Sequence, residues 1–374
     1  MAAGLSPVEE LKRAISPIPE IIEEAREGRM FILVDAENRE NEGDLVIPAQ
    51  FATPAAVNFM AKHGRGLICL ALTAERTRVL GLEPMAPRNQ TRMRTAFTVS
   101  IEAREGVSTG ISAHDRAHTV AVAIDAGKGE GDIVSPGHVF PLRGRDGGVL
   151  VRAGHTEASI DIARQAGLNP SAVICEIMND DGAMARLPEL VAFAQFHNLK
   201  IGAIEELIAF RRLNDRTIER LCEAPFATRA GKDFRLIVFL NRLDGVEHAA
   251  LVKGEIRADK PTLVRVHRVE FAADVIGGMG ARAGLIDQSL DEIEREGAGV
   301  LVLLRDLEPN ALTRRLSGKV ELDSGDAQRV IGIGSQILRE LGVGRMIVLA
   351  NAPQRLVGLE GYGLTIDGWR GFTP

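Results

Sequence analysis

The chain has 374 residues, of which 45% are apolar and 26% charged, the ordinary balance of a globular protein. This length is too great for one small core and favours two domains. A net charge of −6 without a basic run argues against nucleic acid as the main partner. No apolar run approaches the roughly 20 residues that span a bilayer, and the first residues lack an apolar core of secretory length. We therefore expect a soluble cytoplasmic protein without a membrane or nucleic-acid partner.

The three cysteines, Cys69, Cys175 and Cys222, lie far apart in the chain and form no CxxC pair. Their spacing argues against a disulfide framework and excludes the common cysteine-rich zinc sites. Each lies within or beside an apolar stretch. We predict buried, reduced thiols, which are typical of cytoplasmic proteins.

The first part of the chain alternates helical and extended patterns, as an α/β domain does. A helix is predicted to end at Arg26, before Gly28, and Pro54 opens another. The predicted helices continue as 54–63, 112–126, 156–166, 187–197 and 204–212. The predicted strands are 30–34, 67–72, 98–103 and 172–178.

A charged segment without an apolar stripe, RRLNDRTIER, follows at 211–220, and Pro225 comes soon after. We place the domain boundary within 213–225. Strands are predicted beyond it at 235–240, 249–252, 262–269, 300–304 and 346–350, and helices at 285–296 and 326–341. The expected fold is a two-domain α/β (α+β) protein, with domains at 1–215 and 220–374.

The densest acidic cluster, DAENRENEGD, runs from Asp35 to Asp44 directly after the first apolar strand. Several carboxylates on one turn can bind a hard divalent cation such as Mg²⁺ or Mn²⁺. Arg39 in the same loop could hold a phosphate. The alternative is a solvated charged connection, which has no function of its own.

A second cluster, RAGHT, runs from Arg152 to Thr156 at the start of a predicted helix. Thr156 is predicted as the N-cap, and Gly154 would let the backbone approach a ligand. The free N–H groups of a helix start beside an arginine form an anion site, and His155 could reach a metal or substrate there. The alternative is a capped helix with a surface arginine and an idle histidine.

Two polar residues interrupt apolar segments. Glu176 lies within AVICEIM, and His138 within PGHVFP. A buried carboxylate has a raised pKa, which suits acid/base catalysis, whereas Glu176 on a wet face would be inert. His138 alone would more often be a hydrogen-bonded core histidine than a catalyst.

Together these segments resemble the 3,4-dihydroxy-2-butanone 4-phosphate synthase family over nearly all of residues 15–212. Five stretches match in the family's order and spacing. They are DAENRENEGDLV, HGRGLICLAL, TAFTVSIEAREGVSTGISAHDRAHT, PGHVFPLRGRDGGVLVRAGHTEASIDIARQAGL and CEIMNDDGAMAR. The resemblance implies a homodimeric lyase of riboflavin biosynthesis. It would convert D-ribulose 5-phosphate to the butanone phosphate plus formate, with Mg²⁺ or Mn²⁺ as cofactor and without zinc.

The resemblance also implies roles for individual residues. Glu40 and His155 would hold the metal, and His138 and Glu176 would be the catalytic acid/base residues. The substrate-binding residues would be Arg39, Glu40, Asp44, Arg152, Ala153, Gly154, His155, Thr156 and Glu176. Ala153 replaces a glycine that is frequent in the family, a small departure.

Residues 220–374 resemble a GTP cyclohydrolase II domain through LVRVHRVEFAADVIGG, EREGAGVLVLLRD and GIGSQILRELGVGRMIVLANAPQRLVGLEGYGL. That family needs three zinc-binding cysteines, but the corresponding segment, Ala273–Met279, has none. The stretch Arg305–Asn310 also replaces the family's nucleotide-contact residues. Without thiolates no zinc-bound water can form. We expect a non-catalytic module, with a bifunctional enzyme that also acts on GTP as the alternative.

Overall fold

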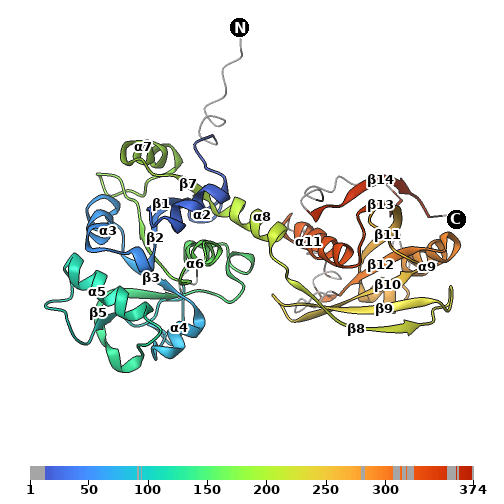
Figure 1. Ribbon diagram of the computed structural model, residues 1–374, viewed down its shortest axis with the longest axis horizontal. Helices are drawn as coiled ribbons and strands as arrows, with labels where there is room; N and C mark the ends of the chain where they lie inside the picture. The colour runs from blue at the N-terminus through green and yellow to red at the C-terminus, as the bar shows by residue number, and fades with distance from the viewer. Residues whose placement is uncertain are drawn as a thin grey trace, which may run out of the picture. The chain divides into compact units, whose positions relative to one another are not determined.

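The predicted alternation of strands and helices forms two mixed seven-stranded sheets in the computed structural model (Figure 1). The two-domain α/β fold expected from the sequence is therefore confirmed. The chain divides into two compact units, residues 1–211 and 212–374. The structure describes residues 13–90, 92–93, 95–278, 283–305, 312–313, 317, 324–351, 359 and 362–372.

The first unit has the strand order β4-β5-β3-β6-β2-β1-β7. Its helices are α2 (Ile18–Arg26), α3 (Pro54–Phe59), α4 (Ala74–Val79), α5 (Ala113–Ile124), α6 (His155–Gln165), α7 (Leu187–His197) and α8 (Ile204–Asn214). Its strands are β1 (Phe31–Val34), β2 (Gly43–Pro48), β3 (Cys69–Leu72), β4 (Ile101–Ala103), β5 (Ile133–Arg143), β6 (Ala172–Glu176) and β7 (Ile201–Ala203). A π-helix, η2 (Met60–Gly64), extends α3.

Helices cover both faces of this sheet, so its central strands are apolar on both sides. In β6, Val173 and Cys175 pack into the cluster that contains residues of α3, α5 and α7. The alternate residues Ala172 and Ile174 pack with α2, α6 and α8. By this alternation, Glu176 belongs to the α6 face.

The second unit has the order β14-β13-β11-β12-β10-β9-β8. Its strands are β8 (Ile218–Phe226), β9 (Phe234–Asn241), β10 (Val246–Lys253), β11 (Pro261–Arg268), β12 (Gly299–Leu304), β13 (Arg345–Leu349) and β14 (Thr365–Arg370). Helix α11 (Ser324–Glu340) packs on one face and α9 (Leu285–Glu296) on the other. A π-helix, η5 (Phe271–Val275), follows β11.

The charged segment near the expected boundary contains the end of one helix and the start of one strand. Helix α8 continues to Asn214, and β8 begins at Ile218 as an edge strand paired with β9. Seven consecutive residues of β8, 220–226, are exposed. An exposed edge strand needs no apolar alternation, which is why the sequence did not predict this strand. Cys222 lies on this strand and is exposed, so its predicted burial was wrong.

The other two thiols are buried, as predicted. Burial raises the pKa of Cys175 to about 12, and it raises the pKa of Cys69 as well. Both side chains are therefore neutral core groups rather than nucleophiles.

Candidate active site

Strand register brings the polar residues of the first unit together at one edge of its sheet, the edge formed by the ends of the central strands β2 and β6. Asp44 on β2 lies opposite Glu176 on β6. On the other side of β2, Gly43 lies opposite Val34, the last residue of β1. The acidic loop that begins at Asp35 therefore leaves the sheet beside Glu176, although 141 residues separate them in the chain.

His138 reaches the same edge from the other side of β3. Cys69 of β3 pairs with Ile174 of β6 and also with Phe140 of β5. Glu176 comes two residues after Ile174, and His138 two residues before Phe140, so both lie toward the end of the sheet at which β3 begins. Adjacent strands are about 4.8 Å apart, so two strand positions correspond to about 10 Å between their backbones.

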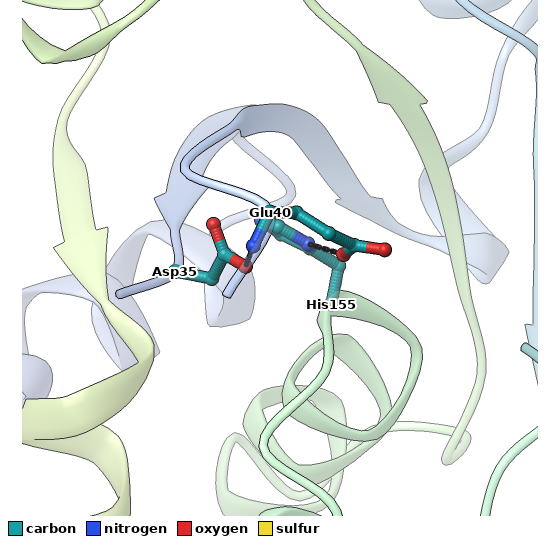
Figure 2. A group of neighbouring side chains, drawn as sticks. All are labelled: Asp35, Glu40 and His155. Atoms are coloured by element: carbon teal, nitrogen blue, oxygen red, sulfur yellow. Dashed lines mark hydrogen bonds and ion pairs between the residues drawn. The ribbon is translucent and has the colours of Figure 1, made fainter. Parts of the chain in front are cut away.

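Asp35, Glu40 and His155 form a cluster whose candidate ligand atoms all lie within 4.8 Å of one another (Figure 2). Asp35 follows β1, Glu40 lies in the acidic loop, and His155 begins α6. Two carboxylates and one imidazole suit a divalent cation. The sequence assigned Glu40 and His155 to the metal; it did not single out Asp35 from the loop.

The tautomer of His155 suits metal binding. Its Nε2 lies 3.2 Å from the carbonyl oxygen of Leu33 and donates a hydrogen bond to it. The ring's other nitrogen, Nδ1, then carries a lone pair and lies 3.9 Å from Glu40 Oε2. Burial lowers the pKa of His155, which keeps the ring neutral. A backbone carbonyl that fixes the distal N–H of a histidine ligand is a usual feature of metal sites.

Negative charge is concentrated at this edge. Burial raises the pKa of Asp44 well above its usual value, and repulsion from Glu176 and Glu42 adds to the effect. Burial also raises the pKa of Glu42 and of Glu176. Asp35 differs: burial acts to raise its pKa, but the backbone N–H donors at Glu42 and Glu40, together with His155 and Arg39, outweigh burial and lower the pKa. Such a set of carboxylates is stabilised by a cation.

Arg39 supplies part of the positive charge. Its Nη1 lies 2.8 Å from Asp35 Oδ2 and also contacts Glu40. The side chain is 18% exposed. The guanidinium therefore contacts the candidate metal ligands rather than standing apart from them as a separate phosphate site.

Glu176 is held by the segment that leads into β3. Leu67 N–H donates to Glu176 Oε2 at 2.8 Å. A Cβ at Gly66 would lie 2.5 Å from both Glu176 Oε2 and its backbone oxygen, so only glycine allows this approach. The Glu176 carboxylate is therefore half-buried and fixed by a hydrogen bond. The alternative that Glu176 lies on a solvent-exposed face is wrong.

The acidic loop is fastened from α7. Arg186, the residue before that helix, donates to the carbonyl oxygen of Glu40 at 2.9 Å and also to that of Asn41. A Cβ at Gly43 would lie 2.5 Å from a methyl carbon of Leu190. The loop is therefore a packed structure rather than a solvated connection.

The start of α6 corrects one prediction. Gly154 is the N-cap, and the helix begins at His155. Thr156 lies inside the first turn, buried, and does not cap it. Because glycine also tolerates the extended N-cap backbone, the threonine was the wrong choice between neighbouring candidates.

Arg152 is not a free surface arginine. Its Nη1 lies 2.7 Å from the buried Glu157 Oε2. Its Nη2 donates to the Met93 carbonyl and Thr95 Oγ1, each at 3.1 Å. The side chain, 18% exposed, ties the helix start to a second loop. Ala153 lies between it and Gly154 and is exposed.

His138 has a side chain that is 45% exposed, so it is not a core histidine. Its Nδ1 is hydrogen-bonded to the carboxylate of Glu102 on β4. The sequence-based reading missed Glu102. The signal was present as a lone acidic residue between Ile101 and Ala103, both of which are buried.

The acidic turn at residues 179–183 has a structural role. Asp181 Oδ1 accepts from Ala183 N–H at 2.9 Å, and Gly182 has φ +86°, as ordinary turn chemistry predicts. The side chain of Asp180 is 94% exposed and pairs with Arg65. Neither acid joins the metal cluster identified among the described residues.

The second unit has a different polar arrangement after β11. His267 Nε2 lies 2.9 Å from Asp274 Oδ2, and the two side chains are 0% and 2% exposed. Glu270 N–H donates to the same oxygen at 2.6 Å. Of the chain's three cysteines only Cys222 falls in this unit. Most of the stretch 305–310 lies outside the described residues.

Across the residues that the structure describes, no helix is both long and apolar enough to cross a membrane.

Comparison with protein families gives two matches along the chain. The 3,4-dihydroxy-2-butanone 4-phosphate synthase model matches residues 19–210, and the GTP cyclohydrolase II model matches residues 219–370.

Full-length relatives share both halves. The chain is 47% identical to a 3,4-dihydroxy-2-butanone 4-phosphate synthase of Neisseria meningitidis serogroup A over 358 residues, 95% of this chain and 98% of the relative. A two-domain 3,4-dihydroxy-2-butanone 4-phosphate synthase from A. baumannii has a similar structure. The TM-score is 0.76 and the identity 41%, with 95% of this chain and 99% of the other covered.

A further structure covers the first unit alone. It is a 3,4-dihydroxy-2-butanone 4-phosphate synthase in complex with two magnesium ions, with a TM-score of 0.52 and 40% identity. The match covers 54% of this chain and 98% of the other.

Proposed function

The chain belongs to the 3,4-dihydroxy-2-butanone 4-phosphate synthase family, and we propose that its first unit converts D-ribulose 5-phosphate to 3,4-dihydroxy-2-butanone 4-phosphate and formate. This is a reaction of riboflavin biosynthesis. The observation that carries the proposal is one sheet edge where the Asp35–Glu40–His155 cluster lies beside acids of raised pKa.

We propose Mg²⁺, or Mn²⁺ in its place, as the cofactor, held by Asp35, Glu40 and Nδ1 of His155. The donor set fits a hard cation. A bound cation would also offset the repulsion among the acids around Asp44. When bound, the cation would stabilise negative charge on adjacent substrate oxygens. The related structure with two magnesium ions supports this choice of metal.

The proton transfers are assigned to Glu176 and His138. Formation of an enediol from the sugar phosphate requires a base, and the later loss of water requires an acid. Burial raises the pKa of Glu176, which moves it toward the range in which a carboxyl can exchange protons near neutral pH. His138 presents a partly exposed imidazole at the same edge.

Substrate binding is assigned to residues around these groups. They are Arg39, Glu40, Asp44, Arg152, Ala153, Gly154, His155, Thr156 and Glu176. The beginning of α6 offers backbone N–H groups toward an anion. Arg39 and Arg152 add positive charge beside it.

The second unit is proposed to be non-catalytic. Its only cysteine, Cys222, lies on the edge strand β8, whereas His267 at the end of β11 forms a buried pair with Asp274 of η5. The full-length relative from A. baumannii carries the synthase name with two domains, which supports a single activity. We propose domain limits of 1–215 and 220–374, a homodimer and a cytoplasmic location.

The deciding experiment measures formate from D-ribulose 5-phosphate with the purified full chain and Mg²⁺. We expect turnover that EDTA removes and added Mg²⁺ restores. Conversion to an isomeric sugar phosphate without formate would contradict the proposal. Incubation with GTP and zinc should release no formate, and turnover there would show that the second unit is an enzyme. Light scattering tests the dimer.

A further inference from the structure

The contact between His138 and Glu102 lies where β5 departs from regular pairing. Ile101 pairs with Val139, but the next residue of β4, Glu102, pairs with Val134. Four residues of β5, 135–138, are thereby looped out of the ladder. His138 is the last of them, and its Nδ1 is hydrogen-bonded to the carboxylate of Glu102.

The looped segment is packed tightly against β4. A Cβ at Gly137 would lie 2.1 Å from the carbonyl carbon of Ile101 and 2.5 Å from the nitrogen of Glu102. Gly137 N–H donates to Ser100 Oγ at 3.1 Å. The backbone next to His138 is therefore fixed against β4 by close packing and by a hydrogen bond.

The carboxylate of Glu102 packs against the turn that contains Gly110. A Cβ at Gly110, whose φ is +82°, would lie 1.6 Å from Glu102 Oε1. The turn that contains Gly110 is fixed by the buried Asp115, whose Oδ2 accepts from Gly110 N–H and from Ser108 Oγ, each at 3.0 Å. The Glu102 side chain is 17% exposed, against 45% for His138.

This geometry has a chemical consequence for the imidazole. A carboxylate accepts hydrogen bonds but does not donate them, so it selects the tautomer with the proton on Nδ1. The lone pair is then on Nε2, the nitrogen on the far side of the ring. The same carboxylate also stabilises the ring when Nε2 takes up a proton, as carboxylate–histidine pairs do in hydrolases.

We infer that Glu102 is a positioning residue of the reaction, which orients the ring of His138 and presents its Nε2 to the substrate. The inference rests on the proposed function, because it assumes that His138 transfers a proton. It assigns no contact between Glu102 and the substrate.

The test compares Glu102→Gln with Glu105→Gln in the full chain. Glu105 is an exposed acid three residues further along and serves as the matched control. Glutamine keeps the shape of Glu102, but its amide can donate to Nδ1 and select the wrong tautomer. We expect kcat for formate release to fall on the order of 100-fold, with KM for ribulose 5-phosphate changed less than about twofold. Glu105→Gln should leave both unchanged.

Two readouts separate positioning from mere stability. Nitrogen NMR of ¹⁵N-histidine-labelled protein, with His138 identified by its loss in His138→Gln, should show Nδ1 protonated in the wild type and altered in Glu102→Gln. Glu102→Asp, which keeps the charge, should recover part of kcat. Both variants should melt at the wild-type temperature.

An unchanged kcat in Glu102→Gln would overturn the inference. So would a wild-type ring protonated on Nε2, or equal changes in kcat and KM accompanied by a lowered melting temperature. If the wild type itself releases no formate, the proposed function fails instead, and the NMR tautomer still decides whether Glu102 orients the ring.

Discussion

The two units handle buried acids in opposite ways. At the edge of the first sheet, Asp44 and Glu176 lie opposite each other, and burial raises the pKa of both. After β11 of the second sheet, the buried Asp274 accepts hydrogen bonds from His267 and from the Glu270 backbone. Acids crowded together favour a bound cation. The His267–Asp274 pair differs also from Glu102–His138, because its two side chains are 0% and 2% exposed and cannot meet a substrate. The difference supports the proposal that the reaction takes place in the first unit.

The largest effect is expected from a substitution that disrupts the proposed metal site. Glu40→Gln should reduce formate release about a thousandfold or more, since the charge stabilisation by a bound divalent metal is worth several kcal/mol. Glu37→Gln, at an exposed position of the same loop, is the matched control and should retain activity. Isothermal titration with Mg²⁺ should show weakened binding only for Glu40→Gln. If Glu40→Gln released formate at the wild-type rate at saturating Mg²⁺, Glu40 would not be a metal ligand.

A somewhat smaller loss is expected from the acid/base group. Glu176→Gln removes the proton-transfer function but keeps the hydrogen bond from Leu67 N–H, so kcat should fall by about 100- to 10,000-fold. Asp180→Asn, exposed and four residues away, should have little effect. Steady-state kinetics with saturating Mg²⁺ distinguishes the two variants. Comparable activity in both would remove Glu176 from the mechanism.

The second unit should respond in stability rather than activity. Asp274→Asn weakens the buried pair with His267, and we expect a cost of about 2 kcal/mol in the free energy of unfolding of this unit. Asp287→Asn changes an exposed ion pair with Arg229 and should cost less than about 1 kcal/mol. Denaturant unfolding checks both, and formate release should stay at the wild-type level. A loss of formate release in Asp274→Asn would contradict the proposal that the second unit takes no part in the reaction.

The smallest effect concerns a histidine outside both sites. Burial lowers the pKa of His197, and the neighbouring His63 lowers it further. The neutral ring's contribution to stability is fully present above the unfolded pKa of about 6.5 and is lost as pH falls through the lower folded pKa. His197→Phe keeps ring contacts with Phe193 and Phe196. Its unfolding free energy should therefore fall less than that of the wild type between pH 7 and pH 5.

Local patterns predicted some elements to the residue. Helices α7 (Leu187–His197) and α9 (Leu285–Glu296) have the bounds expected from the sequence. Apolar periodicity and stop signals act over a few residues, so they can be read without the rest of the chain. Strand β2 was missed because its first residues, Gly43 and Asp44, belong to an acidic run that looked like a loop.

The candidate site shows the same division. The acidic loop, Glu176 and His138 were recognisable as residues with chemistry, and their pattern identified the family. The sequence did not reveal that Asp35 joins Glu40 and His155, or that Glu102 holds His138. These contacts depend on side-chain direction and on close approaches at Gly66 and Gly110.

The sequence by itself determined the two-domain α/β fold, the family and the absence of zinc cysteines, because residue types and their spacing are properties of the chain. Only the tertiary structure decided which acids meet at one sheet edge, since strand register brings Asp44 to Glu176 across more than a hundred residues. It also decided the direction in which their pKa values shift, because burial and neighbouring charge set a pKa and neither is a property of sequence position.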